Sequence, residues 1–245
     1  ETVDCASIDD VFRKVEAGMV AYAVVPVENS TEGAIGRSLD LLLNTPLKIC
    51  GETVVRVHHC LLRKGEGRDG IKQVYSHPQS LAQCHEWLNQ NLPGVARVPV
   101  SSNAEAARLA AADASSAAIA GETAGEIYGL TMLARNIEDE PNNTTRFLVL
   151  GSHDAARSGR DKTSFVMSAP NRPGAMHELL GPFARNGVSM TKLESRPSGT
   201  NLWDYVFYVD VEGHREDEAV AKSIAELKSI APLLKVLGSY PVAVL

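Results

Sequence analysis

The sequence predicts an α/β protein built from two domains of unequal size, and three observations lead to this prediction. Between residues 21 and 151, short apolar runs alternate with segments of helical periodicity, which is typical of crossover units around a parallel sheet. Residues 152–161 are polar, rich in small residues and without periodicity, as in a linker. Residues 162–245 then follow the order strand, helix, strand, strand, helix, strand, which is the ferredoxin-like pattern.

Length and composition exclude several functional classes. The 245 residues are 44% hydrophobic, which is enough for two cores. With a formal net charge of −6 and scattered basic residues, nucleic acid is not an expected partner. Four cysteines without CxxC spacing argue against a zinc site or a redox pair, so we expect reduced thiols in a cytoplasmic protein. No apolar run reaches the roughly 20 residues of a membrane span, so no membrane contact is expected.

The first helix and strand frame a candidate ligand site. Residues 7–10 fit a capping box and precede an apolar helical face that extends to about Gly18. The apolar run 21–27 predicts a strand buried on both faces of a parallel sheet. Ligand sites in open α/β sheets lie where such strands end, so Glu28, Asn29 and Ser30 are candidate ligand contacts. The alternative is an ordinary loop in which Ser30 caps the next helix.

The alternation continues through the first domain and repeats in the second. We expect helices over 38–43, 79–89 and 104–112, a long strand over 47–62, and strands over 74–75, 96–100 and 117–120. In the second domain we expect strands over 162–169, 188–196, 203–211 and 234–244, and helices over 174–186 and 216–230. Trp203, Tyr205, Phe207 and Val209 alternate on one face of their strand, which indicates core or dimer packing.

A second group of polar residues follows other predicted strands. Ser76 ends a strand, and Gln83 lies one helical face beyond Gln79, so Ser76 and Gln83 can point into one cleft. His77 precedes a proline and is either a general base or a structural residue. Ser101 and Ser102 begin a helix whose N–H groups can hold a carboxylate, and helix capping is the equal alternative.

Motifs in five parts of the chain stand in a recognisable order. They are PVENSTEG at 26–33, SHPQSLAQC at 76–84, the segment 118–130, NTTRF at 143–147, and GAMH at 174–177 with ESRP at 194–197. In this order and spacing they resemble the motifs of prephenate dehydratases, and the C-terminal unit resembles an ACT domain of the phenylalanine-binding kind. The resemblance covers nearly the whole chain, and this number of motifs in one order is specific.

The resemblance implies a fold and a reaction. The first domain, residues 1–151, would form two α/β lobes similar to type II periplasmic binding proteins, with 47–62 and 147–151 crossing between the lobes. Family members begin with a strand and a Gly-rich loop, and we expect this segment to be missing here. The reaction would convert prephenate to phenylpyruvate with loss of carbon dioxide and the ring hydroxyl, without a cofactor or metal. Aromatisation drives it, so the enzyme mainly positions carboxylates and protonates the leaving oxygen.

The same resemblance assigns the site residues. Thr145, before Arg146 and Phe147, would assist the departing hydroxyl, and the adjacent Thr144 is its rival. Arg146 would clamp a substrate carboxylate or form a structural ion pair. In the second domain, residues 162–245, the close backbone approach at Gly174 and Ala175 suits a bound phenylalanine, although a turn after Pro173 would look the same. The expected effector contacts are Gly174, Ala175, Met176, His177, Glu194, Ser195, Arg196 and Pro197.

Three points stay open on the sequence alone. Ser189 stands where the family usually has Asn, which removes one expected polar contact. Arogenate dehydratase differs only in whether its substrate carries an amine or a keto group, and a non-catalytic amino-acid sensor is the alternative of another class. We expect at least a homodimer, or a homotetramer, formed through residues 162–245.

Overall fold

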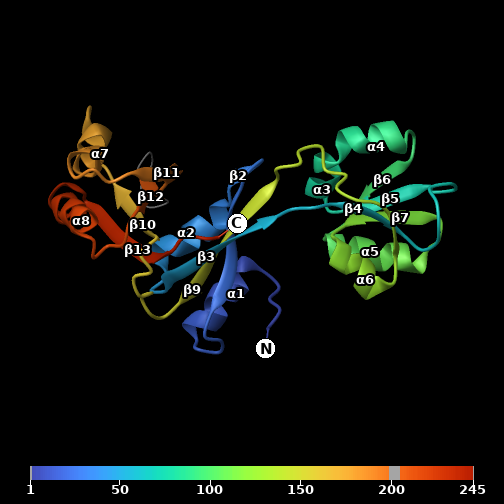
Figure 1. Ribbon diagram of the computed structural model, residues 1–245, viewed down its shortest axis with the longest axis horizontal. Coiled ribbons are helices and arrows are strands. Elements are labelled where there is room, and N and C mark those ends of the chain that lie inside the picture. The colour runs from blue at the N-terminus through green and yellow to red at the C-terminus, as the bar shows by residue number, and fades with distance from the viewer. Residues whose placement is uncertain (1, 199–204, 245) are drawn as a thin grey trace. The chain divides into compact units, whose positions relative to one another are not determined.

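The computed structural model describes residues 2–198 and 205–244 and divides into two compact units. One unit combines Glu1–Val55 with Thr145–Leu245 and is called the discontinuous unit here. The other, Arg56–Thr144, is called the inserted unit. The chain leaves the discontinuous unit within the stretch predicted to cross between lobes, and it returns two residues before the strand predicted for the second crossing (Figure 1).

The N-terminal part of the discontinuous unit is a four-stranded sheet in the order β2-β1-β9-β3. Its elements are α1 (Ile8–Glu16), β1 (Ala23–Asn29), β2 (Gly33–Ala34), α2 (Gly36–Asn44), β3 (Lys48–Arg56) and β9 (Thr144–Gly151). Because β1 pairs antiparallel with both neighbours, its burial alternates and Val24 is 55% exposed. The prediction that this strand is buried on both faces of a parallel sheet is therefore wrong.

The start of α1 follows the predicted cap. The Ser7 hydroxyl accepts the N–H of Asp10 at 3.2 Å, so the N-cap is confirmed. The Asp10 carboxylate accepts the N–H of Ala6 at 3.4 Å, one residue earlier than in a regular capping box. Phe12 and Val15 then point into the core.

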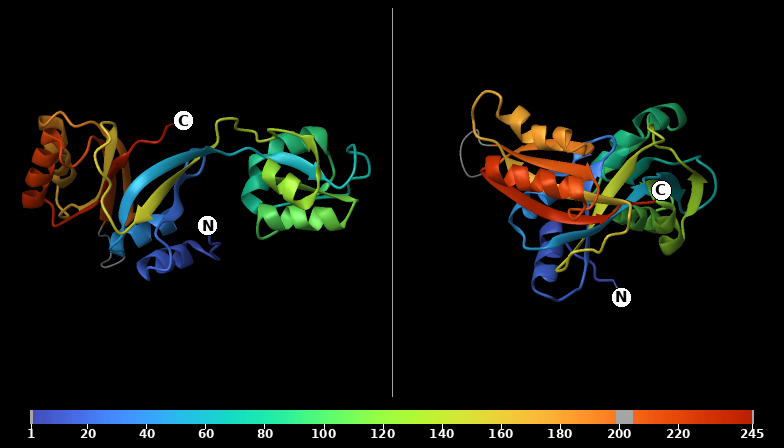
Figure 2. Two further views of the ribbon diagram at one scale, coloured as in Figure 1. Left: turned by 60° about the horizontal axis from the view of Figure 1, so that its bottom comes forward. Right: turned by 60° about the vertical axis from the view of Figure 1, so that its left-hand side comes forward.

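The C-terminal part confirms the βαββαβ pattern. Its sheet has the order β11-β12-β10-β13, with α7 and α8 on one face (Figures 1 and 2). The elements are β10 (Asp161–Ser168), α7 (Ala175–Arg185), β11 (Met190–Pro197), β12 (Tyr205–Glu212), α8 (Glu218–Ile230) and β13 (Leu233–Pro241). Phe207 and Val209 pack in the core beneath the helices, so core packing is correct for them. Trp203 lies outside the described residues.

The other face of the C-terminal sheet packs on the N-terminal sheet of the same unit. Val206 and Tyr208 share a core with Leu39, and the Tyr208 hydroxyl donates to the Leu39 carbonyl at 2.6 Å. The Lys235 ammonium donates to carbonyls at the end of α2, where the helix dipole favours a cation. At Gly238 the backbones approach so closely that a Cβ would lie 2.2 Å from the Ile49 oxygen.

The inserted unit is a five-stranded mixed sheet in the order β6-β5-β7-β4-β8. Its elements are β4 (Cys60–Arg63), β5 (Gln73–Ser76), α3 (Pro78–Gln83), α4 (His85–Asn91), β6 (Ala96–Pro99), α5 (Asn103–Ala112), β7 (Ser116–Ala120), α6 (Glu122–Tyr128) and β8 (Thr131–Ala134). β5 pairs parallel with β6 and β7, whereas β4 pairs antiparallel with β7 and β8. The predicted alternation of strands and helices is confirmed, but the sheet is not purely parallel.

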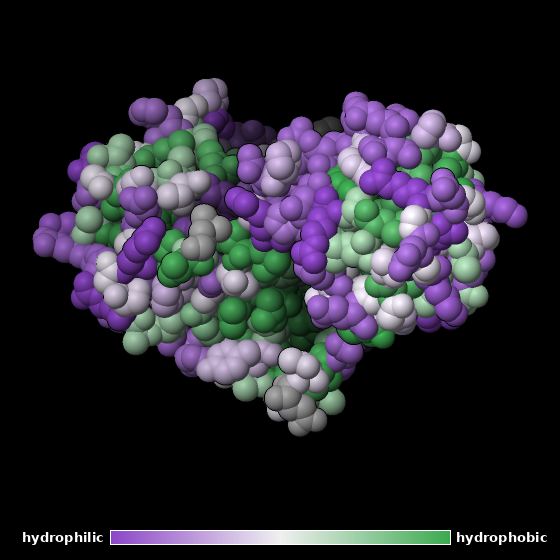
Figure 3. All heavy atoms as spheres, turned by 45° about the vertical axis from the view of Figure 1, so that its right-hand side comes forward, coloured by the Kyte–Doolittle hydropathy of each residue, from purple (hydrophilic) through white to green (hydrophobic). Residues whose placement is uncertain are grey.

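Two predicted elements are each divided. The expected strand 47–62 is two strands, β3 and β4, which belong to different units. The expected helix 79–89 breaks at Cys84 into α3 and α4. Apolar runs alone did not show these breaks, because apolar residues continue on both sides of each break. Apolar residues also remain on the surface, where Figure 3 shows them among polar side chains.

Candidate functional site

Asn29 and Thr145 form the first part of the candidate site. They are paired across β1 and β9, and the Asn29 amide Nδ2 donates to the Thr145 hydroxyl at 3.0 Å. The Asn29 oxygen Oδ1 accepts the N–H groups of Thr31 and Glu32 at 3.0 and 3.1 Å, which fixes the orientation of its amide. Thr145, having accepted one hydrogen bond, presents its own O–H proton as a donor. The two residues predicted at separate motifs are thus brought together.

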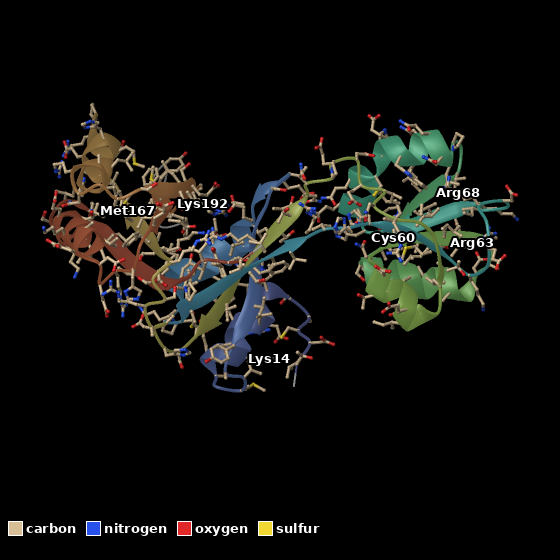
Figure 4. All side chains as sticks on the ribbon, viewed as in Figure 1. Lys14, Cys60, Arg63, Arg68, Met167 and Lys192 are labelled. Atoms are coloured by element: carbon tan, nitrogen blue, oxygen red, sulfur yellow. The ribbon has the colours of Figure 1, made fainter. Side chains whose placement is uncertain are left out.

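Glu28 and Arg146 are the neighbouring pair on the same two strands. Successive side chains of a strand point to opposite faces, so this pair faces away from Asn29 and Thr145. Glu28 contacts Lys192 of β11 at 2.8 Å, and Arg146 contacts Asp210 of β12 at 2.6 Å. Figure 4 labels Lys192 beside the C-terminal sheet. The structure therefore places both on the side of the C-terminal sheet. For Arg146 this is the ion-pair alternative, and its role as a substrate clamp stays a prediction.

The groups around Arg146 keep its guanidinium protonated. Burial lowers the pKa of Arg146, but Asp210, Tyr240 and Glu52 outweigh it and raise the pKa above the usual value. Burial raises the pKa of Glu52, but Arg146 and Lys162 outweigh it, so this pKa lies below the usual range. The buried Tyr240 hydroxyl has a raised pKa and stays neutral. The cluster is thus ionic and permanently charged at neutral pH.

Ser30 and Thr144 are the remaining candidate residues of the motifs at 26–33 and 143–147. Ser30 is exposed in the turn after β1. The Thr144 hydroxyl donates to the Asn142 carbonyl at 2.9 Å, a local backbone contact. The cross-strand hydrogen bond from the Asn29 amide to the Thr145 hydroxyl favours Thr145 as the site residue.

In the inserted unit, Ser76 is fully buried. Its hydroxyl contacts the Asn103 side chain at 2.9 Å and donates to the Ile119 carbonyl at 2.7 Å. His77 is the N-cap of α3, where its Nδ1 accepts the Gln79 N–H, so the structure shows the structural alternative for it. Asn103 also accepts the His77 N–H at 3.1 Å and holds the end of β5 against the start of α5.

Ser102 caps α5 by accepting the Glu105 N–H at 3.0 Å, whereas Ser101 is exposed just before it. The capping alternative therefore describes Ser102. Carboxylate binding by Ser101 stays a prediction.

Gln83 contacts one of two neighbouring histidines, and Glu138 contacts both of these histidines. Gln83 Oε1 contacts His59 Nε2 at 2.8 Å, and His59 is 3% exposed. Glu138 accepts the His59 N–H at 2.9 Å and contacts His58 Nδ1 at 2.8 Å. Ser76 and Gln83 belong to separate hydrogen-bonded groups of the same unit, and Gln83 is the more accessible of the two.

The Glu138 contacts predict an acid-sensitive inserted unit. Burial raises the pKa of Glu138, but the His59 N–H and His58 outweigh it and place the pKa below 4.5. The carboxylate therefore stabilises the fold above the unfolded pKa, and this contribution is lost as pH falls through the lower folded pKa. We expect the protection of amides in the inserted unit against hydrogen exchange, corrected for the intrinsic rate at each pH, to fall below about pH 4.5. In Glu138→Gln, amides of the inserted unit should exchange faster than in wild type at pH 7, and their protection should depend less on pH. A pH profile of protection equal to that of wild type would contradict this role of Glu138.

Two of the predicted effector residues, Ala175 and Met176, line a cavity of about 180 Å³ in the C-terminal part. Gly174 has φ +79° and lies just before α7, so it takes the left-handed conformation that suits glycine. The cavity is lined by Ala169, Pro170, Asn171, Arg172, Ala175, Met176, Tyr205 and Phe207. His177 is exposed on the first turn of α7.

The segment ESRP divides between the two faces of β11. Ser195 and Pro197 pair with Phe207 and Tyr205, and directly paired residues share a face. They therefore lie on the face of the cavity. Glu194 and Arg196 lie on the other face, where Arg196 Nε donates to Asp40 of α2 at 2.9 Å. Ser195 and Pro197 thus share the sheet face of the cavity but do not line it, and Pro197 borders a different pocket with Arg196 and Asp40.

Several residues of these clusters were not predicted from the sequence. They are Glu52, Asp210, Tyr240, Lys162 and Lys192 around Arg146, and His59, Glu138 and Asn103 in the inserted unit. An acidic residue in an otherwise apolar strand was the available signal for Asp210, which lies within Tyr205–Glu212. Among residues 2–198 and 205–244, no group of three or more His, Cys, Asp or Glu could hold a metal ion. No helix of this part is long and apolar enough to cross a membrane.

Comparison with known proteins identifies the family. The model of the prephenate dehydratase family matches residues 1–155, and that of the ACT domain matches residues 163–229. The bifunctional chorismate mutase/prephenate dehydratase of Neisseria gonorrhoeae is 57% identical, covering 100% of this chain and 68% of that protein. The arogenate dehydratase/prephenate dehydratase 2 of Arabidopsis thaliana is 40% identical, covering 99% and 67%. This chain therefore spans about two thirds of the length of these relatives.

A solved structure of this family is also similar to the chain. The crystal structure of prephenate dehydratase from Arthrobacter aurescens in complex with L-Phe has a TM-score of 0.89 and 37% identity, covering 98% of this chain and 81% of that one. The matched domains, the shared fold and the level of identity lead to one conclusion. The chain belongs to the prephenate dehydratase family and carries a C-terminal ACT domain.

Proposed function

We propose that the chain catalyses the decarboxylative dehydration of prephenate to phenylpyruvate, a step of phenylalanine biosynthesis, and that phenylalanine inhibits it. The hydrogen bond between Asn29 and Thr145 is the observation that carries the proposal. The substrate loses its ring carboxylate as carbon dioxide, and the released electron pair completes the aromatic ring as the ring hydroxyl departs. That hydroxyl needs a proton or a strong hydrogen bond to leave as water.

Thr145 is suited to assist the departing oxygen. Because its oxygen accepts from the Asn29 amide, its O–H proton points elsewhere and can serve the leaving group. A hydroxyl has too high a pKa to act as a free acid, so hydrogen-bond donation is the proposed role. Gln83 and the exposed residues Ser30 and Ser101 remain candidate contacts for the substrate carboxylates.

An assay with purified protein distinguishes the possible functions. Prephenate and arogenate are supplied separately, and the release of phenylpyruvate or phenylalanine is followed. Turnover of prephenate at the higher kcat/KM supports the proposal, whereas higher kcat/KM for arogenate supports an arogenate dehydratase. Binding of phenylalanine without turnover of either compound would indicate an amino-acid sensor.

We propose that the effector site is the cavity beside Gly174. Gly174→Val places a β-branched residue at φ +79°, a conformation that costs about 1–2 kcal/mol for such residues and distorts the start of α7. Calorimetry should show loss of phenylalanine binding, with prephenate turnover retained. Equal phenylalanine affinity in wild type and variant would contradict the site. Gly159→Val, also at positive φ but in the segment before β10, is the matched control.

We further propose the domain limits 1–151 and 162–245, with 152–161 as the connection, and a homodimer or homotetramer formed through the C-terminal part. Leu193 and Tyr205 are exposed at 42% each, on the edge strand β11 and its neighbour. Apolar residues on a free sheet edge favour pairing between chains. Light scattering on wild type and Leu193→Lys tests this, because the charged variant should lower the mass. The free thiols suit a cytoplasmic location.

A further inference from the structure

A buried cluster of charges joins the two sheets of the discontinuous unit, with Arg146 at its centre. Arg146 Nε donates to Glu52 at 2.7 Å, Nη1 to Asp210 at 2.6 Å and Nη2 to the Tyr240 hydroxyl at 3.0 Å. The side chains of Glu52 and Asp210 are 2% and 9% exposed. All three guanidinium nitrogens thus have protein partners, and three of the five N–H donors are used within the protein.

The C-terminal sheet completes this cluster. The Ser164 hydroxyl donates to Asp210 at 2.5 Å and lies 2.6 Å from the Tyr240 hydroxyl, so the polar groups around Asp210 are satisfied. A cavity of about 20 Å³ beside Arg146, Asp210 and Lys192 has room for one water molecule. Dense packing and satisfied hydrogen bonds fix the position of the Arg146 side chain.

The charges of the two sheets are complementary. Lys162 contacts Glu52 at 2.9 Å, and Lys192 contacts Glu28 at 2.8 Å, so cations of the C-terminal sheet meet anions of the N-terminal sheet. Arg146 and Asp210 repeat this pairing with the signs exchanged. Removing one member leaves a buried charge without its partner, which is costly. The cluster therefore holds the two sheets in one arrangement.

The cluster ends one residue from the candidate catalytic pair. Glu28 and Arg146 are cross-strand partners, and Asn29 and Thr145 are the next partners along β1 and β9. A displacement of the Arg146 backbone moves the backbone of Thr145, because the two residues share a planar peptide bond. Asp210 lies on β12, the strand that also brings Tyr205 and Phe207 to the effector cavity.

We propose that Arg146 is a positioning residue that fixes Thr145 by binding Asp210 of the C-terminal sheet, and that phenylalanine acts on catalysis through this ion pair. The proposal rests on the proposed function for the role of Thr145. When effector binding shifts β12, Asp210 moves with the strand. Its ion pair then displaces Arg146, and Arg146 displaces the Thr145 hydroxyl that assists the leaving group. By linkage, weakening the ion pair weakens the effect of phenylalanine on turnover.

The test compares Asp210→Asn, Arg146→Gln and the double variant in the full chain. Asp210→Asn should lower kcat about 10- to 100-fold, the cost of a misplaced catalytic group, with KM for prephenate within about twofold of wild type. Phenylalanine should still bind by calorimetry but inhibit at least about tenfold less. The double variant should be no worse than Arg146→Gln, because the two residues act as one unit. Glu226→Gln, which removes an exposed ion pair with Arg185, is the control and should resemble wild type.

Hydrogen exchange tests the role of the Arg146–Asp210 ion pair without relying on activity. The segment 143–150 should exchange faster in Asp210→Asn than in wild type, whereas the segment 71–76 of the inserted unit should not change. Unchanged exchange at 143–150 overturns the proposal even if the wild type proves inactive towards prephenate, and that inactivity would refute the proposed function alone. A raised KM in Arg146→Gln together with wild-type kinetics in Asp210→Asn would also overturn it, by showing Arg146 to be a substrate contact.

Discussion

Thr145→Ala is expected to lower kcat by about 10²- to 10⁴-fold, the range typical of a lost proton-transfer group. The hydroxyl accepts the Asn29 amide at 3.0 Å, so alanine removes both the donor to the leaving group and the partner of Asn29. Alanine also lacks the γ-methyl group, but the side chain is only half-buried, so the fold should persist. Steady-state kinetics with prephenate, together with a thermal melt, measures the two effects separately.

Thr144→Ala is the matched control for this variant. Its hydroxyl donates to a neighbouring backbone carbonyl, so its loss should change kcat less than about tenfold. If both variants, or Thr144→Ala alone, lost most of the turnover, the assignment to Thr145 would be wrong. A second variant, Thr145→Ser, keeps the hydroxyl and should restore most of the lost kcat.

The largest structural effect is expected for Gly238→Ala. A Cβ at this position would lie 2.2 Å from the oxygen and 2.9 Å from the nitrogen of Ile49, which are backbone atoms that cannot rotate away. The C-terminal sheet must then separate from β3, and we expect the free energy of unfolding to fall by about 3 kcal/mol. Urea denaturation followed by fluorescence measures this change.

Gly51→Ala provides the comparison for Gly238→Ala, because Gly51 lies in β3 of the same unit. A Cβ at Gly51 would meet Val149 at 3.7 Å, an ordinary contact, and alanine is the better strand residue. This variant should be neutral or slightly stabilising. Equal stability of the two variants would mean that the close approach at Gly238 relaxes without cost.

The order of elements and the location of the motifs could be predicted from the sequence, because both depend on local patterns. The βαββαβ order followed from strand and helix periodicity, and the cap at Ser7 followed from side-chain chemistry. The pairing of Asn29 with Thr145 was not predicted, because the family motifs only assigned each residue to the substrate site. Their 116-residue separation hides the contact from any local pattern.

The face to which each motif residue points could not be predicted in this way. Residues Glu28 and Asn29 look like one polar cluster in sequence, yet they point to opposite faces because strands alternate. A register shift between Pro26 and Glu28 further changes the phase of this alternation. The partners of Arg146 come from β3, β12 and β13, and only the packing of two sheets brings these strands together. For the same reason, residues 194–197 were predicted to contact the effector together, although Arg196 faces Asp40.

The position of β9 in its sheet has a consequence for the order in which the chain folds. β9 lies between β1 and β3, but the whole inserted unit separates it from β3 along the chain. The N-terminal sheet cannot gain its central strand until this long loop closes, and closure costs more entropy for a longer flexible loop. Folding of Arg56–Thr144 first would turn that loop into a compact body and ease the closure. Core changes in the inserted unit, such as Leu61→Ala, should therefore slow the formation of a sheet to which they contribute no strand.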